Sequence, residues 1–179
     1  PDARSLAGIQ ARAGLESGAW SEAEMAAVAA RTTGASVDDL LAADYVADPL
    51  RAHDIAPYTD AGAAVILASE DRARELVENP AWITGWDHRI DTPNFGARDL
   101  TRSPSTALAA DTAFAGRSRD VDVAEIYDSF TITLAVELES IGFFERGEAG
   151  AAAERGDLGL RATQITLPLR RLSSPLACR

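Results

Sequence analysis

The stretch from Asp120 to Glu148 constrains the fold of this chain more than any other. Its first part, residues 121–126, consists mainly of β-branched and small residues, as a half-buried strand requires. From Phe130 onward, the spacing of apolar residues changes from two to three or four. This change predicts a helix that is buried on most sides and ends at Gly142. We therefore expect a strand, a sharp turn and a buried helix, in that order.

The predicted turn carries Tyr127, Asp128 and Ser129, three polar residues in a row. They lie where the carboxyl end of a strand meets the amino end of a helix, a common place for chemistry in α/β proteins. Either Asp128 or Ser129 can cap the helix, because its side-chain oxygen can accept from a free backbone N–H group. For Asp128 we favour this cap over a role in orienting the phenol.

Two interpretations of Tyr127 stay open at the level of the sequence. In one, the phenol is a catalytic group that donates a proton, or accepts one where its surroundings stabilise the phenolate. In the other, the tyrosine packs half-buried on the sheet and its hydroxyl bonds to the backbone. Tyr127 and its neighbour Asp128 are the candidate catalytic residues.

The amino-terminal part of the chain predicts two short helices. Residues 1–19 carry no strong pattern, and we expect them to be irregular or weakly helical. The pair Ser21–Glu24 has the spacing of a capping box, so a helix begins there and ends at Gly34. The pair Ser36–Asp39 repeats the signal, because an aspartate can take the acidic role.

The remaining pattern alternates between strands and helices. The elements it predicts are strands over 63–68 and 81–90, a helix over 70–79 capped by Ser69, a helix from Ser103 or Ser105 to about Ala115, a weak helix over 151–155 and a strand over 165–169. Leu76 and Val77 should face inward from the first of these helices, and Leu108 from the second. The order argues for an α/β domain with a layered sheet.

Composition excludes several classes of protein. The formal net charge of −11 opposes binding to nucleic acid through the general surface field. The single cysteine, Cys178, excludes an intrachain disulfide and a multi-cysteine zinc site. His53 and His88 follow no recognised metal-ligand spacing, and we expect structural or surface roles for both and no metal site. No apolar run is long enough to span a bilayer and no charged, apolar leader is present, so we expect a cytoplasmic protein.

Five segments, taken in chain order, resemble the thiolase superfamily. The branch they resemble most is the sterol-carrier-protein-type thiolases, often called lipid-transfer proteins. The likeness covers roughly residues 18–150. The five segments are Tyr45-Val-Ala-Asp-Pro-Leu50, Asp60-Ala-Gly-Ala-Ala-Val-Ile-Leu67, Glu125-Ile-Tyr-Asp-Ser-Phe130, Leu138-Glu-Ser-Ile-Gly-Phe143 and Gly147-Glu148.

The resemblance implies a particular organisation of the chain. Thiolases have two halves of like topology, and it identifies residues 1–56 as a remnant of the first half. Residues 57–179 then form the second, thiolase-like half, with a divergent tail over 156–179. The implied fold class is α/β, a thiolase-like layered domain with a mixed sheet between helices, incomplete relative to the family.

Four departures separate this sequence from the family pattern. The nucleophilic cysteine of the first half has no counterpart here, and the catalytic Gly-His-Pro of the second half is missing. Where the family has Asp-Gly-Ala-Ala, this chain reads Asp60-Ala-Gly-Ala63, which would move the tight turn by one residue. The tail follows a different pattern from the family, which suggests divergence or a shifted reading of the gene.

The resemblance implies carbon–carbon bond chemistry on acyl-CoA, either thiolase-type acyl transfer or retro-aldol cleavage of acyl-CoA side chains. A tyrosine at position 127 resembles the retro-aldol branch, where tyrosines act as general acid or base. Two alternatives stay open: a non-catalytic acyl-CoA or lipid-binding or scaffold subunit, and a fragment with no activity of its own. The absent cysteine and Gly-His-Pro favour the first of these alternatives.

Partners are also implied by the resemblance alone. Family members are usually homodimers, and the aldolase branch works with a separate zinc-ribbon and OB-fold protein. The substrate would be a coenzyme A thioester, and we expect no further cofactor. We expect no nucleic acid partner and no membrane span.

Overall fold

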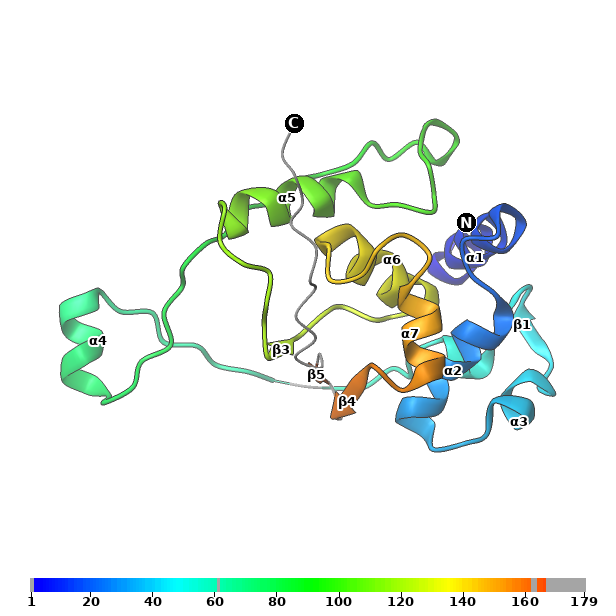
Figure 1. Ribbon diagram of the computed structural model, residues 1–179, viewed down its shortest axis with the longest axis horizontal. Coiled ribbons are helices and arrows are strands. Elements are labelled where there is room, and N and C mark those ends of the chain that lie inside the picture. The colour runs from blue at the N-terminus through cyan, green and yellow to red at the C-terminus, as the bar shows by residue number, and fades with distance from the viewer. Residues whose placement is uncertain (1, 61, 162–163, 167–179) are drawn as a thin grey trace.

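The computed structural model describes residues 2–60, 62–161 and 164–166 of the 179-residue chain. The described part is mixed α/β, as the sequence predicts, with two small sheets beside the helices (Figure 1). The helices are α1 (Ala3–Ser17), α2 (Glu22–Thr33), α3 (Val37–Leu41), α4 (Glu70–Leu76), α5 (Pro104–Phe114), α6 (Thr131–Ile141) and α7 (Ala149–Arg155), with 3-10 turns η1 (Ala52–Asp54) and η2 (Phe95–Ala97). The strands are β1 (Tyr45–Ala47), β2 (Leu50–Arg51), β3 (Val123–Ala124), β4 (Gly159–Arg161) and β5 (Gln164–Thr166).

Both sheets are antiparallel. Strands β1 and β2 form a hairpin, and β5 lies between β3 and β4 in the second sheet. The pairing of β3 with β5 joins Ala124 to Ile165 and so ties the organising stretch to the end of the described chain. The predicted strand over 165–169 is thus observed at Gln164–Thr166, and its last three positions lie outside the described residues, as does Cys178.

Helix α6 is central to a group of four helices, α1, α2, α6 and α7, which we call the helical body (Figure 1). It presents Leu134 and Leu138 to α2 and α7, and Ile132 and Val136 to α1. Small residues on the neighbouring helices allow close approach. An added Cβ at Gly150 of α7 would lie 2.6 Å from the Cβ of Glu24 on α2. Buried apolar surface of this kind is the main favourable term in folding.

The amino-terminal segment differs from its prediction. Residues 3–17 form the regular helix α1, where an irregular or weakly helical segment was expected. Asp2 caps it by accepting from the backbone N–H of Ser5 at 2.8 Å, and Gly18 ends it in the left-handed conformation. Its buried face is made of alanine and glycine, including Ala11. Alanine and glycine are only weakly hydrophobic, so this face gives little periodic signal in the sequence, although its small side chains pack closely.

The predicted capping box at Ser21 is confirmed, and Ser36 is confirmed as an N-cap, where the Asp39 carboxylate accepts from the Ser36 hydroxyl at 2.6 Å. The Ser21 hydroxyl accepts from the backbone N–H of Glu24 at 3.2 Å, and the Glu24 carboxylate accepts in return from the backbone N–H of Ser21 at 2.6 Å. Helix α2 ends at Gly34, which has a φ of +72°. Ser36 caps α3 through the backbone N–H of Asp39 at 3.1 Å.

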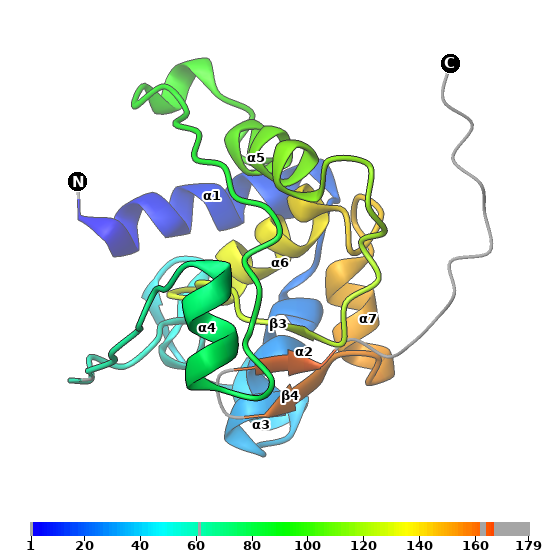
Figure 2. The same cartoon turned by 90° about the vertical axis from the view of Figure 1, so that its left-hand side faces the viewer.

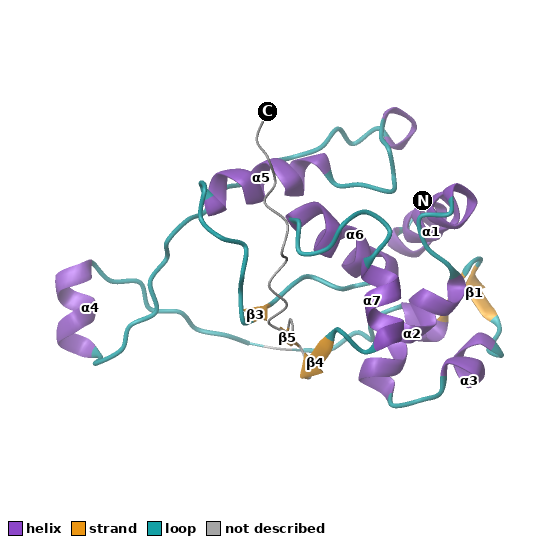
Figure 3. Cartoon of the chain, in the orientation of Figure 1, coloured by secondary structure: helices purple, strands orange, loops and turns teal. Residues whose placement is uncertain are grey.

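Residues 62–90, which we call the arm, extend away from the helical body and carry α4 (Figure 1), which faces the viewer in Figure 2. The strands predicted at 63–68 and 81–90 are not formed. Both segments are extended loops on either side of α4 (Figure 3). A strand is stable only where a neighbouring strand receives its backbone hydrogen bonds, and no strand in the described part of the chain pairs with either segment.

The arm therefore exposes the side chains that were predicted to be buried. Val65 and Ile66 are 81% and 89% exposed. Helix α4 ends at Leu76 rather than at residue 79, Ser69 makes no side-chain cap bond, and both Leu76 and Val77 are more than half exposed. These apolar side chains surround a hollow of about 670 Å³ between α4 and its flanking loops.

Helix α5 follows the predicted range but not the predicted face. It runs from Pro104 to Phe114, and Ala115 is its C-cap residue. Leu108 is exposed, whereas Ala110 is buried against the body. The Ser103 hydroxyl does not cap the helix and instead contacts the Thr106 hydroxyl at 2.7 Å.

Candidate functional site

The candidate site is the turn that joins β3 to α6. The strand and the buried helix are confirmed, although the strand has only two paired residues, Val123 and Ala124. Helix α6 buries its apolar face as predicted and ends at Gly142, with a φ of +86°. The turn therefore stands between a sheet on one side and the central helix of the body on the other.

The predicted cap of this helix is wrong. Helix α6 begins at Thr131, with Phe130 in the N-cap position and no side-chain cap bond, so neither Asp128 nor Ser129 caps it. The cause is a contact with another part of the chain. The backbone N–H of Ala56 donates to the Ser129 carbonyl at 2.9 Å, and residues 55 and 130 form an antiparallel bridge. This pairing keeps Phe130 extended, so the helix starts after it.

A buried carboxylate lies beneath the start of α6. Asp54 is 2% exposed, and its Oδ1 accepts from the Thr131 hydroxyl at 2.6 Å. Its Oδ2 accepts from the backbone N–H of Arg51 at 2.8 Å and lies 3.6 Å from Nε2 of His53. A buried carboxylate is tolerated only with such partners, so these contacts hold Asp54 in one place.

The same network continues to the start of α2. The Arg51 guanidinium donates to the Glu22 carboxylate at 2.6 Å and lies 4.3 Å from the centre of the Tyr45 ring. The Tyr45 hydroxyl donates to the same carboxylate at 3.0 Å. Partial burial of Glu22 opposes its ionisation, but the hydrogen bonds from Arg51 and Tyr45 outweigh it and lower the pKa of Glu22.

Sequence reasoning missed this network. An aspartate three residues after Arg51 has the spacing of a helix cap, and this spacing could have predicted the local bond from the Arg51 backbone N–H to Asp54. The bond to Thr131 spans 77 positions, and no local pattern reports it. His53 has the structural role that we expected, because its side chain is buried beside Asp54.

The two predicted catalytic residues are both exposed on the turn. Tyr127 is 78% exposed, and Asp128 is exposed as well. Within the described part of the chain, no group bonds to the Tyr127 hydroxyl or to the Asp128 carboxylate. The half-buried tyrosine of the second interpretation is therefore not observed.

An apolar hollow of about 320 Å³ adjoins the turn. It lies between α5 and β3, and its walls include Ala110, Phe114, Val123, Ile126 and Phe143. Ile126 lines this hollow, whereas its neighbour Tyr127 is not one of the lining residues.

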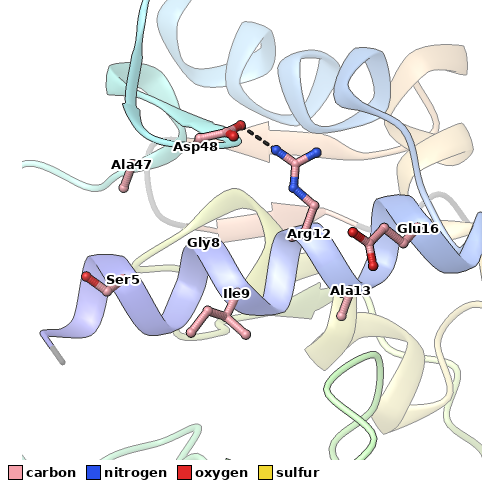
Figure 4. A pocket seen from close by; sticks show the side chains of 8 residues that line it. All are labelled: Ser5, Gly8, Ile9, Arg12, Ala13, Glu16, Ala47 and Asp48. Atoms are coloured by element: carbon pink, nitrogen blue, oxygen red, sulfur yellow. Dashed lines mark hydrogen bonds and ion pairs between the residues drawn. The ribbon is translucent and has the colours of Figure 1, made fainter.

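A second groove, of about 510 Å³, lies where α1 crosses the end of β1 (Figure 4). Its one arginine, Arg12, is paired with Asp48 at 2.5 Å, and Glu16 lies further along the same helix. The groove therefore presents no unpaired cation to an anionic ligand.

The described residues include no group of three or more His, Cys, Asp or Glu side chains placed to hold a metal ion. Within residues 2–60, 62–161 and 164–166, no helix is long and apolar enough to cross a membrane.

Comparison with known proteins identifies relatives for this arrangement. Residues 89–168 match the family described as "Thiolase C-terminal domain-like". An acetyl-CoA acetyltransferase of Methanothermobacter thermautotrophicus is 37% identical over 125 residues, which cover 68% of this chain and 33% of that protein. A steroid side-chain-cleaving aldolase of Thermomonospora curvata is 30% identical over 123 residues, covering 64% and 31%. Sterol carrier protein 2 of Gallus gallus is 29% identical over 131 residues, covering 68% and 24%.

A solved structure supports the same fold. The structure titled "Ltp2-ChsH2(DUF35) aldolase" superposes with a TM-score of 0.66 at 24% identity, covering 83% of this chain and 44% of that one. The chain spans about a third of the length of the first two of these relatives and about a quarter of the third. The resemblance seen in the sequence is therefore confirmed: residues 89–168 match the thiolase C-terminal domain-like family, and the relatives include an acetyl-CoA acetyltransferase and sterol carrier protein 2.

Proposed function

We propose that the protein carrying this sequence makes or breaks a carbon–carbon bond next to the thioester of an acyl-CoA. One observation carries the proposal: Tyr127 presents an exposed phenol, without a side-chain partner among the described residues, on the turn that precedes a buried helix. The relatives named as an acetyltransferase and as an aldolase support this class of chemistry. The substrate brings its own coenzyme A, and the proposed reaction needs no other cofactor.

The proposed reaction in the retro-aldol direction uses Tyr127 as the acid–base group. As phenolate, it accepts the proton of the β-hydroxyl, and a carbonyl forms at the β-carbon. The electron pair of the breaking Cα–Cβ bond moves into the thioester enolate. The phenol, or water, then returns a proton to Cα. Asp128, next in the chain, is proposed to orient the phenol.

The test compares Tyr127→Phe with the unchanged protein in two assays, retro-aldol cleavage of a 3-hydroxyacyl-CoA and thiolysis of a 3-ketoacyl-CoA by free CoA. We expect cleavage to fall by at least about 100-fold, the usual contribution of a positioned acid–base group. Tyr58→Phe is the matched control, because Tyr58 is also exposed but lies on another segment. Full cleavage activity in Tyr127→Phe would show that the phenol is not the acid–base group.

A second candidate function is a non-catalytic acyl-CoA or lipid-binding or scaffold subunit. The exposed apolar side chains of the arm favour it, because such surfaces are commonly covered by a partner. Binding of acyl-CoA measured by calorimetry, without product in either assay, would select this function. We propose two assemblies, a homodimer and a complex with a zinc-ribbon and OB-fold protein. Light scattering of the protein, alone and mixed with such a partner, distinguishes them by mass.

A further inference from the structure

The turn that carries Tyr127 is held at both ends and free in the middle. On its amino side, Ala124 pairs with Ile165 of β5. On its carboxyl side, the Ser129 carbonyl accepts from Ala56 at 2.9 Å. Because Tyr127 has no side-chain partner among the described residues, these two ends determine where its phenol lies.

The carboxyl end has a second, side-chain attachment. The Thr131 hydroxyl donates to Asp54 at 2.6 Å, and both side chains are buried. Asp54 is in turn held by the backbone N–H of Arg51 at 2.8 Å. The carboxylate is therefore a fixed point, and the first residue of α6 is bonded directly to it.

The hydrogen bond between Thr131 and Asp54 fixes the carboxyl end of the turn. A backbone pair such as that between Ala56 and Ser129 can slide or fray at the edge of a short bridge. A hydrogen bond to a buried side chain that is itself held by a second hydrogen bond resists that motion, because breaking it leaves buried polar atoms unpaired. Thr131 is also β-branched, so its side chain has few rotamers in a helix and transmits the position of Asp54 to the backbone.

We infer that Asp54 and Thr131 are positioning residues for Tyr127, acting through the hydrogen bond between them. The inference rests on the proposed function for its effect on rate, but not for its effect on the position of the phenol. Neither side chain touches the substrate in this account. Their role is to keep the turn in the one conformation that presents the phenol.

The first test measures the phenol itself. The chain has three tyrosines, so 3-fluorotyrosine labelling gives three fluorine resonances, assigned with single Tyr→Phe variants. In Thr131→Val, which removes the hydroxyl at nearly constant shape, we expect the Tyr127 resonance to shift or broaden while the Tyr45 resonance stays in place. Thr131→Ser should restore the original spectrum. Thr106→Val, which removes a hydroxyl on α5, is the matched control and should leave all three resonances unchanged.

The second test measures turnover of the 3-hydroxyacyl-CoA. We expect kcat to fall about 100-fold in Thr131→Val and in Asp54→Asn with KM changed little, since a misplaced acid–base group slows the reaction step rather than binding. Thr131→Ser should recover kcat to within about twofold, as a conservative rescue of the same hydrogen bond.

Each outcome decides the inference. An unchanged Tyr127 resonance in Thr131→Val overturns it, whatever the activity. A global loss of fold in that variant, seen as loss of far-UV circular dichroism, also overturns it, because Thr131 would then hold the whole fold rather than the turn. If the unchanged protein has no activity, the proposed function fails, and the fluorine spectrum alone decides the inference.

Discussion

The helical body and the arm have similar apolar residues but opposite environments. In the body, Leu138 is fully buried between neighbouring helices. In the arm, Ile66 is 89% exposed, although the surrounding run of apolar residues predicts a buried strand. A helix satisfies its backbone hydrogen bonds internally, so it needs only a surface to pack on, whereas a strand needs another strand. An apolar segment is therefore buried only where the backbone hydrogen bonds are satisfied and another part of the protein covers its side chains.

The largest expected effect comes from removing apolar side chains in the two regions. Leu138→Ala should lower the free energy of unfolding by about 2–5 kcal/mol, because it leaves a cavity in a packed core. Ile66→Ala should change it by less than about 0.5 kcal/mol, because the side chain is already in water. Urea unfolding followed by circular dichroism measures both. Equal losses would show that the arm is packed in solution.

The next effect compares two glycines. A Cβ at Gly150 would lie 2.6 Å from the Cβ of Glu24, so Gly150→Ala must push α7 from α2 and should cost about 1–3 kcal/mol. A Cβ at Gly62, in the arm, meets nothing within 4 Å, and Gly62→Ala should leave the thermal midpoint nearly unchanged. A neutral Gly150→Ala would contradict the close contact between the two helices.

A smaller effect separates two helix starts. Ser21 caps α2 by a bond to the backbone N–H of Glu24, and Ser21→Ala should cost about 1 kcal/mol. Ser69 precedes α4 in the arm without such a bond, so Ser69→Ala should cost close to nothing. Chemical denaturation of the two variants, side by side, checks the difference. A similar cost at both positions would show that α4 has a working cap in solution.

The smallest effect concerns a partly buried acid of the body, and it depends on pH. Burial, together with the negative charge of Asp91, raises the pKa of Glu137 on α6 above its ordinary value of 4.5, although a hydrogen bond from Thr106 opposes the shift. Stability from this group is therefore fully present below pH 4.5 and is lost as the pH rises through the raised pKa. Glu137→Gln should make the protein more stable than the unchanged chain at pH 7.

The control for this prediction lies in the arm. Glu70→Gln changes an exposed side chain of α4. Because the Glu70 carboxylate is not buried, removing its charge relieves no desolvation cost, and the thermal midpoint of this variant should not rise. The advantage of Glu137→Gln should disappear when the same unfolding experiments are repeated below pH 4.5. An advantage that persists there would assign the gain to something other than the charge.

The candidate site was only partly predictable. Alternation followed by helical spacing located the turn at Tyr127, Asp128 and Ser129, and the structure places the turn there. The cap at Asp128 or Ser129 was wrong, because pairing of residues 55 and 130 delays the start of α6. No local signal could have shown that pairing, since the two residues lie far apart in the chain.

By itself the sequence determined the elements whose bonds close within a few residues. The capping box at Ser21, the N-cap at Ser36, the end of α6 at Gly142 and the buried face of that helix all depend on near neighbours. Only the tertiary structure decided that Asp54 bonds to Thr131 and that the predicted strands of the arm stay unpaired. Those outcomes depend on which distant segments meet, and neither a capping signal nor a hydrophobic period carries that information.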